Sequence, residues 1–170
     1  MISIRQEKPS DYEAIYELIL AAFATAEEAD GTEQDLVVKL RKGDAYIPEL
    51  ALVAVEDDVI VGHILYSKIR IGDSRSVALA PLSIAPAHQK LGIGTALMQE
   101  GHRLAAELGY EFSVVLGSDC YYPRVGYRPA SEFGIVPPFD VPEKNFMAMA
   151  LQPGAVNPHG VVEYASAFFE

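Results

Sequence analysis

The stretch Gln89-Lys90-Leu91-Gly92-Ile93-Gly94 decides the fold, because it closes a predicted strand at 76–84 and opens a predicted helix at 92–108. Glycine lets a backbone approach a ligand closely, and the first N–H groups of a helix have no partner inside the helix. The positive end of the helix dipole adds attraction for negative charge. Gly92 and Gly94 therefore predict a site for a phosphate group. A tight turn whose glycines serve only packing is the alternative.

Two other kinds of phosphate-binding loop are excluded by the same stretch. A dinucleotide-binding loop has a third glycine where this chain has Leu97, and a nucleotide-triphosphate loop ends in Gly-Lys-Ser/Thr. The pattern that remains is Gln/Arg-x-x-Gly-x-Gly/Ala, which Gln89, Gly92 and Gly94 satisfy.

Strands and helices alternate on both sides of this stretch. Runs of β-branched and apolar residues predict further strands at 2–5, 50–55, 59–66, 112–116, 145–151 and 161–164. Apolar residues at helical spacing predict helices at 10–24, from 32 to a stop at Gly43, and at 92–108, where Ile93, Leu97, Leu104 and Leu108 share one side. The short polar turn at 56–58 predicts a hairpin.

The strand at 76–84 contains Pro81. Proline cannot donate a hydrogen bond to a sheet, so Pro81 predicts a bulge or a local break in pairing. Strand, glycine turn, helix and strand within about 35 residues form a βαβ crossover, which predicts that 76–84 and 112–116 are parallel neighbours. We expect one mixed α/β domain over 1–170, with a core at 1–127 and a proline-rich extension at 128–170.

Length and composition are those of an ordinary globular protein: 170 residues, of which 50% are hydrophobic and 22% are charged. Residues 1–7 lack the pattern of a signal peptide, and no apolar run approaches the roughly 20 residues of a membrane helix. Cys120 is the lone cysteine, which is typical of a reducing compartment. We therefore expect a cytoplasmic protein, either a monomer or a homodimer, that does not enter a membrane.

The side-chain charges exclude one class of function. Thirteen basic and 24 acidic residues give a net charge of −11, whereas a general nucleic-acid or anionic-membrane binder needs a basic surface. The negative charge suits a cationic partner such as an amine, although it also serves solubility. The four histidines lack the spacing of a metal site, so we expect no metal. His63 and His88 are expected to be structural or solvated.

Three segments together resemble the GNAT superfamily of acyl-CoA N-acyltransferases over most of residues 1–127. They are the 89–94 stretch, Leu79-Ala80-Pro81-Leu82-Ser83-Ile84-Ala85-Pro86, and Tyr121-Tyr122-Pro123-Arg124-Val125-Gly126-Tyr127, which is similar to a Tyr-x-x-x-Gly-Phe segment. The forms Ala-Pro-Leu and Tyr-Tyr-Pro-Arg resemble a bacterial branch described only as predicted N-acetyltransferases. The resemblance implies a GNAT fold, in which a central mixed sheet is flanked by helices. Its bulged strand diverges from the parallel neighbour and leaves a V-shaped gap for the pantetheine arm of CoA.

The resemblance also implies where acetyl-CoA, as cosubstrate, would bind. Backbone groups of the glycine stretch and of the bulged strand would hold the pyrophosphate and the pantetheine, with the Thr95 hydroxyl as a further pyrophosphate ligand. The cofactor-binding residues implied in this way are Leu82, Ser83, Ile84, Gln89, Lys90, Leu91, Gly92, Ile93, Gly94, Thr95 and Ser118.

The implied reaction is direct attack by a primary amine of a small molecule or a peptide on the thioester of acetyl-CoA. Tyr122 matches the tyrosine that stands beside the thiol in the family. A phenol with an ordinary pKa of about 10 is protonated at neutral pH and can donate to the thiolate. Tyr121 is expected to pack or to line the acceptor pocket. The alternative is that both tyrosines are core aromatics with satisfied hydroxyls.

The sequence leaves the general base open. Many relatives use a glutamate on the central strand, but residues 79–84 contain no carboxylate. The candidates are Glu33, on the helix that borders the acceptor site in the family, Asp119, and a chain of water molecules. Cys120 is expected to pack, because its neighbour Asp119 is acidic and no histidine is near it in sequence to activate a nucleophilic thiol.

Two further alternatives follow from the same pattern. A non-catalytic acyl-CoA-binding or regulatory module on this fold is the alternative function, because a fold alone does not settle activity. The extension at 128–170 is expected to cover the acceptor pocket, to form a dimer contact through Phe168 and Phe169, or to extend the edge of the sheet.

Overall fold

The structure, a computed structural model, describes residues 1–24 and 31–169. Its strands are β1 (Ile2–Gln6), β2 (Tyr46–Glu56), β3 (Val59–Ile71), β4 (Ser74–Ile84), β5 (Phe112–Leu116), β6 (Arg128–Pro129), β7 (Ile135–Val136), β8 (Phe146–Ala150) and β9 (Gly160–Glu163). Its α-helices are α1 (Tyr12–Phe23), α2 (Glu33–Arg41) and α3 (Ile93–Glu107). Every predicted strand and helix is confirmed, whereas the two-residue strand β7 was indicated by no sequence pattern. The acidic link expected after the first helix falls mostly on residues 25–30, outside the described part.

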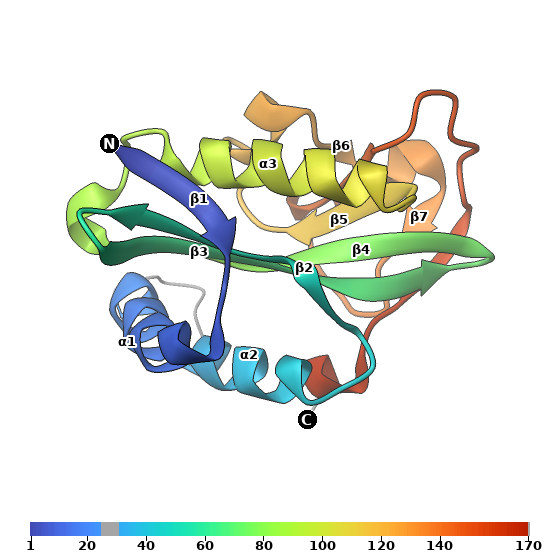
Figure 1. The fold of residues 1–170 in the computed structure, drawn as a ribbon. Helices are drawn as coiled ribbons and strands as arrows, with labels where there is room; N and C mark the ends of the chain where they lie inside the picture. The colour runs from blue at the N-terminus through green and yellow to red at the C-terminus, as the bar shows by residue number, and fades with distance from the viewer. Residues whose placement is uncertain (25–30, 170) are drawn as a thin grey trace.

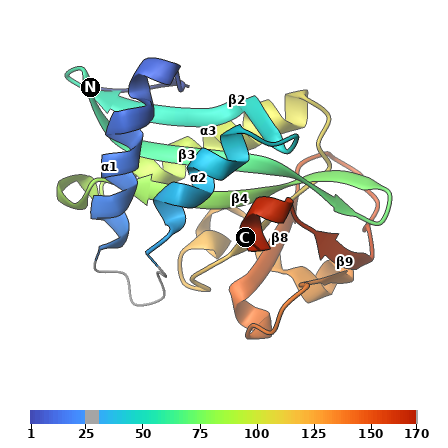
Figure 2. The same cartoon turned by 90° about the horizontal axis from the view of Figure 1, so that it is seen from below.

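The strands form one sheet in the order β1-β2-β3-β4-β5-β8-β6, with β9 beside the end of β3 and β7 beside β9. Neighbours are antiparallel except for the pairs β4–β5 and β7–β9. Helix α3 covers one face of the sheet, and α1 and α2 lie side by side across the other (Figure 1 and Figure 2). The expected class, a mixed sheet flanked by helices, is therefore confirmed.

The hairpin expected at 56–58 joins β2 to β3 through a two-residue turn, because Glu56 pairs with Val59. Asp57 and Asp58 both have positive φ, at 49° and 65°. This is the conformation of a two-residue hairpin turn whose twist matches that of the strands, and aspartate is one of the few non-glycine residues that accept it.

The bulge expected at Pro81 is present in β4. Leu82 pairs with Ile64 and Leu79 pairs with Tyr66, so two residues of β4, Ala80 and Pro81, stand opposite one residue of β3. The peptide bond between them is cis. On its other side β4 pairs with β5 only at 77–78, and the two strands separate beyond that point. The expected splayed parallel pair is therefore confirmed.

Apolar side chains fill the space between the sheet and each helical layer. Leu97 and Met98 of α3 pack against one face, and α1 and α2 pack Ile19 and Leu40 against the other. The expected position of Leu108 with the apolar side of α3 is wrong, because it follows the last turn and is 37% exposed. In the described residues, no helix is long and apolar enough to cross a membrane.

Gly101 of α3 lies under Tyr66 of β3. A Cβ atom built on Gly101 would stand 2.7 Å from Cζ and 2.6 Å from the hydroxyl of Tyr66. That hydroxyl donates to the carbonyl of Met98 on α3, at 3.3 Å. Gly101 therefore leaves the space on α3 that the ring of Tyr66 occupies.

The extension at 128–170 returns to the sheet. Its strand β8 pairs with β5 over the whole of 112–116, and β9 pairs with β3 at 70–71. Phe168 packs partly buried beside the α1 and α2 cluster, and Phe169 is 62% exposed. Of the three expectations for this segment, the extension of the sheet describes its main contacts.

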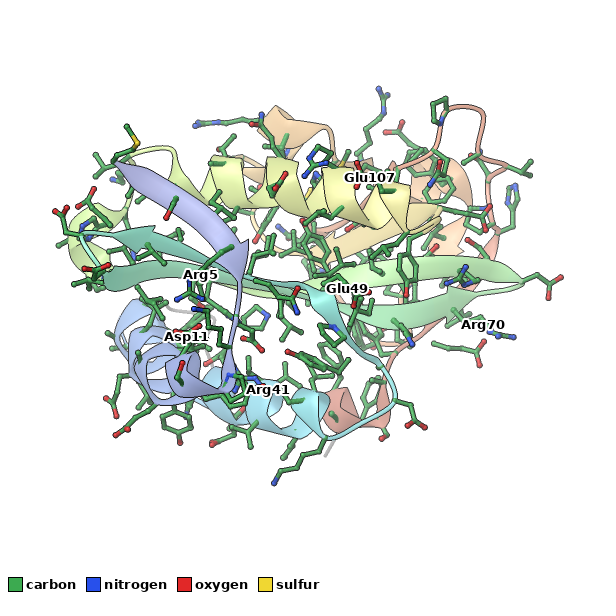
Figure 3. The ribbon with its side chains drawn as sticks, viewed as in Figure 1. Arg5, Asp11, Arg41, Glu49, Arg70 and Glu107 are labelled. Carbon is green, nitrogen blue, oxygen red and sulfur yellow. The ribbon has the colours of Figure 1, made fainter. Side chains whose placement is uncertain are left out.

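A buried polar cluster fastens β1, α2, β2 and β3 together. Arg41 donates two hydrogen bonds of 2.9 Å to the carboxylate of Glu7, and the Tyr46 hydroxyl donates a third at 2.6 Å. His63 Nε2 lies 2.9 Å from Oε1 of Glu7. Figure 3 labels Arg41 at the end of α2, and it also labels Arg5 and Asp11, which form a separate ion pair of 2.7 Å.

The charge state of this cluster follows from its contacts. Burial alone would raise the pKa of Glu7, but hydrogen bonds from His63, Arg41 and Tyr46 outweigh it and lower that pKa from 4.5 to about 2. Burial lowers the pKa of the fully buried His63, so the imidazole is neutral. An ionised carboxylate only accepts, so His63 carries its proton on Nε2. The expectation of a structural His63 agrees with this arrangement.

Candidate functional site

A cavity of about 750 Å³, called here the first cavity, lies where β4 ends and α3 begins. Its lining combines the glycine stretch, the end of β4, the end of α1 and the segment after β5. The residues are Ala22, Phe23, Leu82, Ile84, His88, Gln89, Lys90, Gly92, Ile93, Gly94, Thr95, Cys120, Tyr121, Tyr122 and Arg124.

The glycine stretch forms one wall of the first cavity at the N-terminus of α3. Gly92 precedes the helix with φ of +85°, and a Cβ atom there would meet nothing within 4 Å. Gly92 is therefore required by its backbone conformation and faces open space. Gly94 is required by a contact instead, because a Cβ atom there would collide with the Tyr121 hydroxyl. The free N–H groups of the first turn and the side chains of Lys90 and Arg124 give this wall a positive character.

The end of β4 presents backbone groups toward the gap beside β5. The N–H of Ala85 donates to the carbonyl of Val61 on β3, so by alternation the backbone groups of Leu82 and Ile84 point away from β3. The carbonyl of Ile84 is not free as expected, because it accepts a hydrogen bond of 3.2 Å from the Gln89 side chain. Leu82 keeps the arrangement that was expected.

A second cavity, of about 550 Å³, opens on the side of α1 and α2. It is lined by Phe23, Glu33, Leu36, Leu79, Ala80, Pro81, Leu82, Leu116, Gly117, Ser118, Tyr121 and Tyr122. The two cavities share four residues, Phe23, Leu82, Tyr121 and Tyr122. They therefore meet at the place where β4 and β5 separate, with the two tyrosines at their junction.

Tyr122 stands between the second cavity and the core. Its ring packs against Gly117, where a Cβ atom would come within 3.1 Å of Cδ2. It contacts the rings of Tyr121 and Tyr127 edge to face, at centroid distances of 5.1 and 5.8 Å. Burial raises the pKa of Tyr122, so the phenol stays protonated well above neutral pH. Such a hydroxyl can donate a proton and cannot act as a base near pH 7.

Tyr121 closes the junction from the side of α3. Its hydroxyl lies against Gly94. Burial raises the pKa of Tyr121 as well, and the Thr95 side chain acts in the opposite direction. Thr95, expected to contact a pyrophosphate, lines the first cavity together with Tyr121.

A buried chain of polar groups supports the tyrosines from behind. The Tyr127 hydroxyl lies 2.7 Å from Ser113 Oγ and 2.9 Å from Nε2 of His102. Burial lowers the pKa of His102 to about 4, so this imidazole is neutral at physiological pH. Tyr127 is thus held at both its ring and its hydroxyl, which fixes the surface on which Tyr122 rests.

The carboxylates considered as bases occupy different places. Glu33, the first residue of α2, lines the second cavity. Asp119 lines neither cavity and is paired at 4.0 Å with Lys144 on the surface. Cys120 was expected to pack, but this is wrong, because it is exposed at the rim of the first cavity and its N–H is held by Ser118 Oγ.

Three residues of the expected cofactor set lie outside the first cavity. Leu91 is 68% exposed, and Ser118 lines the second cavity. Ser83 is buried and pairs with His63, so it points to the face opposite Leu82 and Ile84.

The structure adds residues to the site that no motif indicated. Phe23, Leu36 and Leu116 line the second cavity, although apolar spacing marks such residues only as core. Arg124 lines the first cavity, and its place after Tyr-Tyr-Pro was the one available signal. His88 also lines it, with Nε2 3.2 Å from Glu56. Among the described residues, no three His, Cys, Asp or Glu side chains gather as metal ligands would.

Known proteins resemble this chain in sequence and in fold. The family model described as Acetyltransferase (GNAT) family matches residues 12–126. The chain is 33% identical over 148 residues to the uncharacterized N-acetyltransferase YjhQ of Escherichia coli K12, over 84% of this chain and 79% of that protein. A GNAT family acetyltransferase from Brucella melitensis, solved in complex with acetyl-CoA, is 32% identical, with a TM-score of 0.82 over 99% of this chain and 98% of that one. The E. coli GNAT family N-acetyltransferase YhbS, solved in complex with CoA, is 28% identical, with a TM-score of 0.90 over 99% of this chain and 92% of that one. The chain therefore belongs to the GNAT family of acetyltransferases.

Proposed function

We propose that this chain transfers an acetyl group from acetyl-CoA to a primary amine. The observation that carries the proposal is the meeting of two cavities at Tyr121 and Tyr122. The first cavity has the N-terminus of α3 and the cations Lys90 and Arg124, which suit phosphates. The second cavity has the carboxylate of Glu33 and apolar walls, which suit an amine. The complexes of the Brucella protein with acetyl-CoA and of YhbS with CoA support acetyl-CoA as the cosubstrate.

In the proposed complex, the first-turn N–H groups of α3 hold the pyrophosphate, with Lys90 and Arg124 as neighbouring cations. The backbone of Leu82 holds the pantetheine and polarises the thioester carbonyl. The thioester then lies at the junction of the cavities, where an amine from the second cavity can reach its carbonyl carbon. Gly92 leaves room for the phosphates, since nothing lies near its Cβ position.

The proposed reaction balances without a metal or redox partner. An ammonium group loses a proton, its nitrogen forms the new C–N bond, and the C–S bond breaks. Tyr122 donates its proton to the departing thiolate and recovers a proton from the solvent, while the amide nitrogen releases its second proton. Glu33 is the carboxylate placed in the second cavity to accept the first proton, directly or through water.

The experiment is a thiol-release assay with acetyl-CoA and a panel of primary amines, accompanied by calorimetry of acetyl-CoA binding. Amine-dependent thiol release supports the transferase. Acetyl-CoA binding without thiol release above background for any amine would overturn it in favour of a non-catalytic acyl-CoA-binding module.

A further inference from the structure

The second cavity has a composition that selects among amines. Its walls are apolar side chains from four elements: Phe23 of α1, Leu36 of α2, Leu79 and Leu82 of β4, and Leu116 of β5. Its volume of about 550 Å³ is that of a small-molecule pocket. Glu33 is the one charged side chain among the described residues that line it.

The position of Glu33 sets where a positive charge would lie. Glu33 begins α2, and its Oε1 atom is shielded from solvent. Tyr121 and Tyr122 are in the same lining, so the carboxylate and the proposed reaction centre share one small space. Among the described residues of the lining, Glu33 supplies the one negative charge that attracts an ammonium group, and the rest of its molecule meets Phe23, Leu36 and Leu116.

We infer that the acceptor is a small primary amine with a single positive charge on an apolar body, such as an arylalkylamine. This rests on the proposed function and deepens it. A second ammonium group, as in a polyamine, would find no second carboxylate among the described lining residues and would lie against apolar walls, which is costly. A carboxylate beside the amine, as in a free amino acid, would lie near Glu33 and be repelled. The net charge of −11 adds attraction for cations and repulsion of anions at long range.

The test is a matched series of acceptors with the unaltered chain: 2-phenylethylamine, phenylalaninamide, phenylalanine and putrescine. The amide and the free amino acid have the same aromatic body and differ in whether a neutral carboxamide or a carboxylate stands beside the amine. The carboxamide also lowers the pKa of the amine, so the effect of charge recognition is taken from the change in their ratio on Glu33→Gln. We expect kcat/KM to be at least about tenfold higher for 2-phenylethylamine and for phenylalaninamide than for phenylalanine or putrescine, a difference of about 1.4 kcal/mol.

The variant Glu33→Gln tests whether the charge of Glu33 selects the acceptor, as opposed to a general effect of the cavity on every amine. Glu33→Gln should raise KM for 2-phenylethylamine about tenfold and leave the KM for acetyl-CoA unchanged, and it should narrow the preference for phenylalaninamide over phenylalanine. Because Glu33 is also the proposed base, the variant should lower kcat for every acceptor, and the ratio between acceptors is the readout of recognition. The matched control is Glu13→Gln, which removes an exposed acid from the first turn of α1 and should change none of these values. Thermal melting of both variants reports whether they fold.

The two proposals fail in different ways. Preference for putrescine or phenylalanine over 2-phenylethylamine would overturn the acceptor class and leave acetyl transfer standing. An unchanged ratio of phenylalaninamide to phenylalanine in folded Glu33→Gln would remove Glu33 as the charge that selects. Acetyl-CoA binding with no thiol release for any amine in the series or the wider panel would overturn the proposed function, and the acceptor class with it.

Discussion

The hydroxyl of Tyr121 lies directly against Gly94 on the first turn of α3, with Cζ of the ring 3.6 Å from the position of a Cβ atom. The contact joins the glycine stretch to the segment after β5. It explains why the second glycine of the motif is a glycine, whereas the first is explained by its backbone conformation.

This difference predicts a double-mutant result. Gly94→Ala should raise the KM for acetyl-CoA by at least about tenfold, because the methyl group displaces Tyr121 or the helix start. Adding Tyr121→Phe to Gly94→Ala removes the colliding hydroxyl and should bring the KM for acetyl-CoA most of the way back to that of the unaltered chain.

Gly92→Ala is the control for that result. Its added methyl group meets nothing, but φ of +85° strains any other residue by roughly 1 kcal/mol. Tyr121→Phe should therefore not rescue Gly92→Ala. Equal rescue of both glycine variants would show that the Tyr121 contact is not what requires Gly94.

Tyr122→Phe tests the proton donor. We expect kcat to fall by about a hundredfold while the Kd for acetyl-CoA changes by less than about twofold, because the ring contacts remain and only the hydroxyl is lost. Burial raises the pKa of Tyr122, so the acid stays protonated through the ordinary phenol range near pH 10, and kcat should not decline there through loss of this proton. Steady-state kinetics with calorimetry measures both quantities, and an unchanged kcat would remove Tyr122 from the mechanism.

Gly101→Ala tests the packing of α3 on the sheet. Alanine normally stabilises a helix relative to glycine, but here its methyl group overlaps the ring of Tyr66. We expect a loss of about 1–3 kcal/mol in the free energy of unfolding, measured by urea denaturation. Tyr66→Phe should not restore it, since Cζ at 2.7 Å remains after the hydroxyl is removed. A stabilised Gly101→Ala variant would contradict the close approach.

Glu7→Gln tests the buried cluster through pH. The pKa of Glu7 is lowered from 4.5 to about 2 in the folded state, so its contribution to stability is full above pH 4.5 and is lost as pH falls toward 2. The variant should be less stable than the unaltered chain by about 3 kcal/mol at pH 7, and the gap should close by about pH 2.

The control for this prediction is Glu107→Gln, which breaks an exposed pair with Arg103 at the end of α3 (Figure 3). A surface ion pair contributes less than about 1 kcal/mol, so the free energy of unfolding of this variant should stay within that amount of the unaltered chain's at every pH. A Glu7→Gln variant as stable as the unaltered chain at every pH would contradict the negative charge assigned to Glu7.

Local signals made most of the fold predictable. The bulge followed from Pro81, which has no N–H to donate, and the helix start followed from Gly92 and Gly94. The hairpin followed from a short polar turn between β-branched runs. Each of these features is set by residues that are neighbours in the sequence.

Features that depend on distant residues were not predictable in the same way. Glu7 and His63 are 56 positions apart, and nothing near either residue indicates the other. Phe23, Leu36 and Leu116 carry the apolar pattern of core residues, and only the separation of β4 from β5 turns them into the walls of a cavity. The engagement of Ile84 by Gln89 likewise depends on a side-chain orientation that no spacing encodes.

The pairing of β5 bears on how the protein is made. Two residue pairs join β5 to β4, whereas five join it to β8, which lies about thirty positions further along the chain. During synthesis β5 therefore leaves the ribosome before its principal partner, and most of its backbone groups are hydrogen-bonded to water until 146–150 emerges. The wall that Leu116 and Gly117 give to the second cavity is thus completed late in translation, and a nascent or truncated chain that stops short of β8 exposes an unpaired strand edge that can pair with another chain.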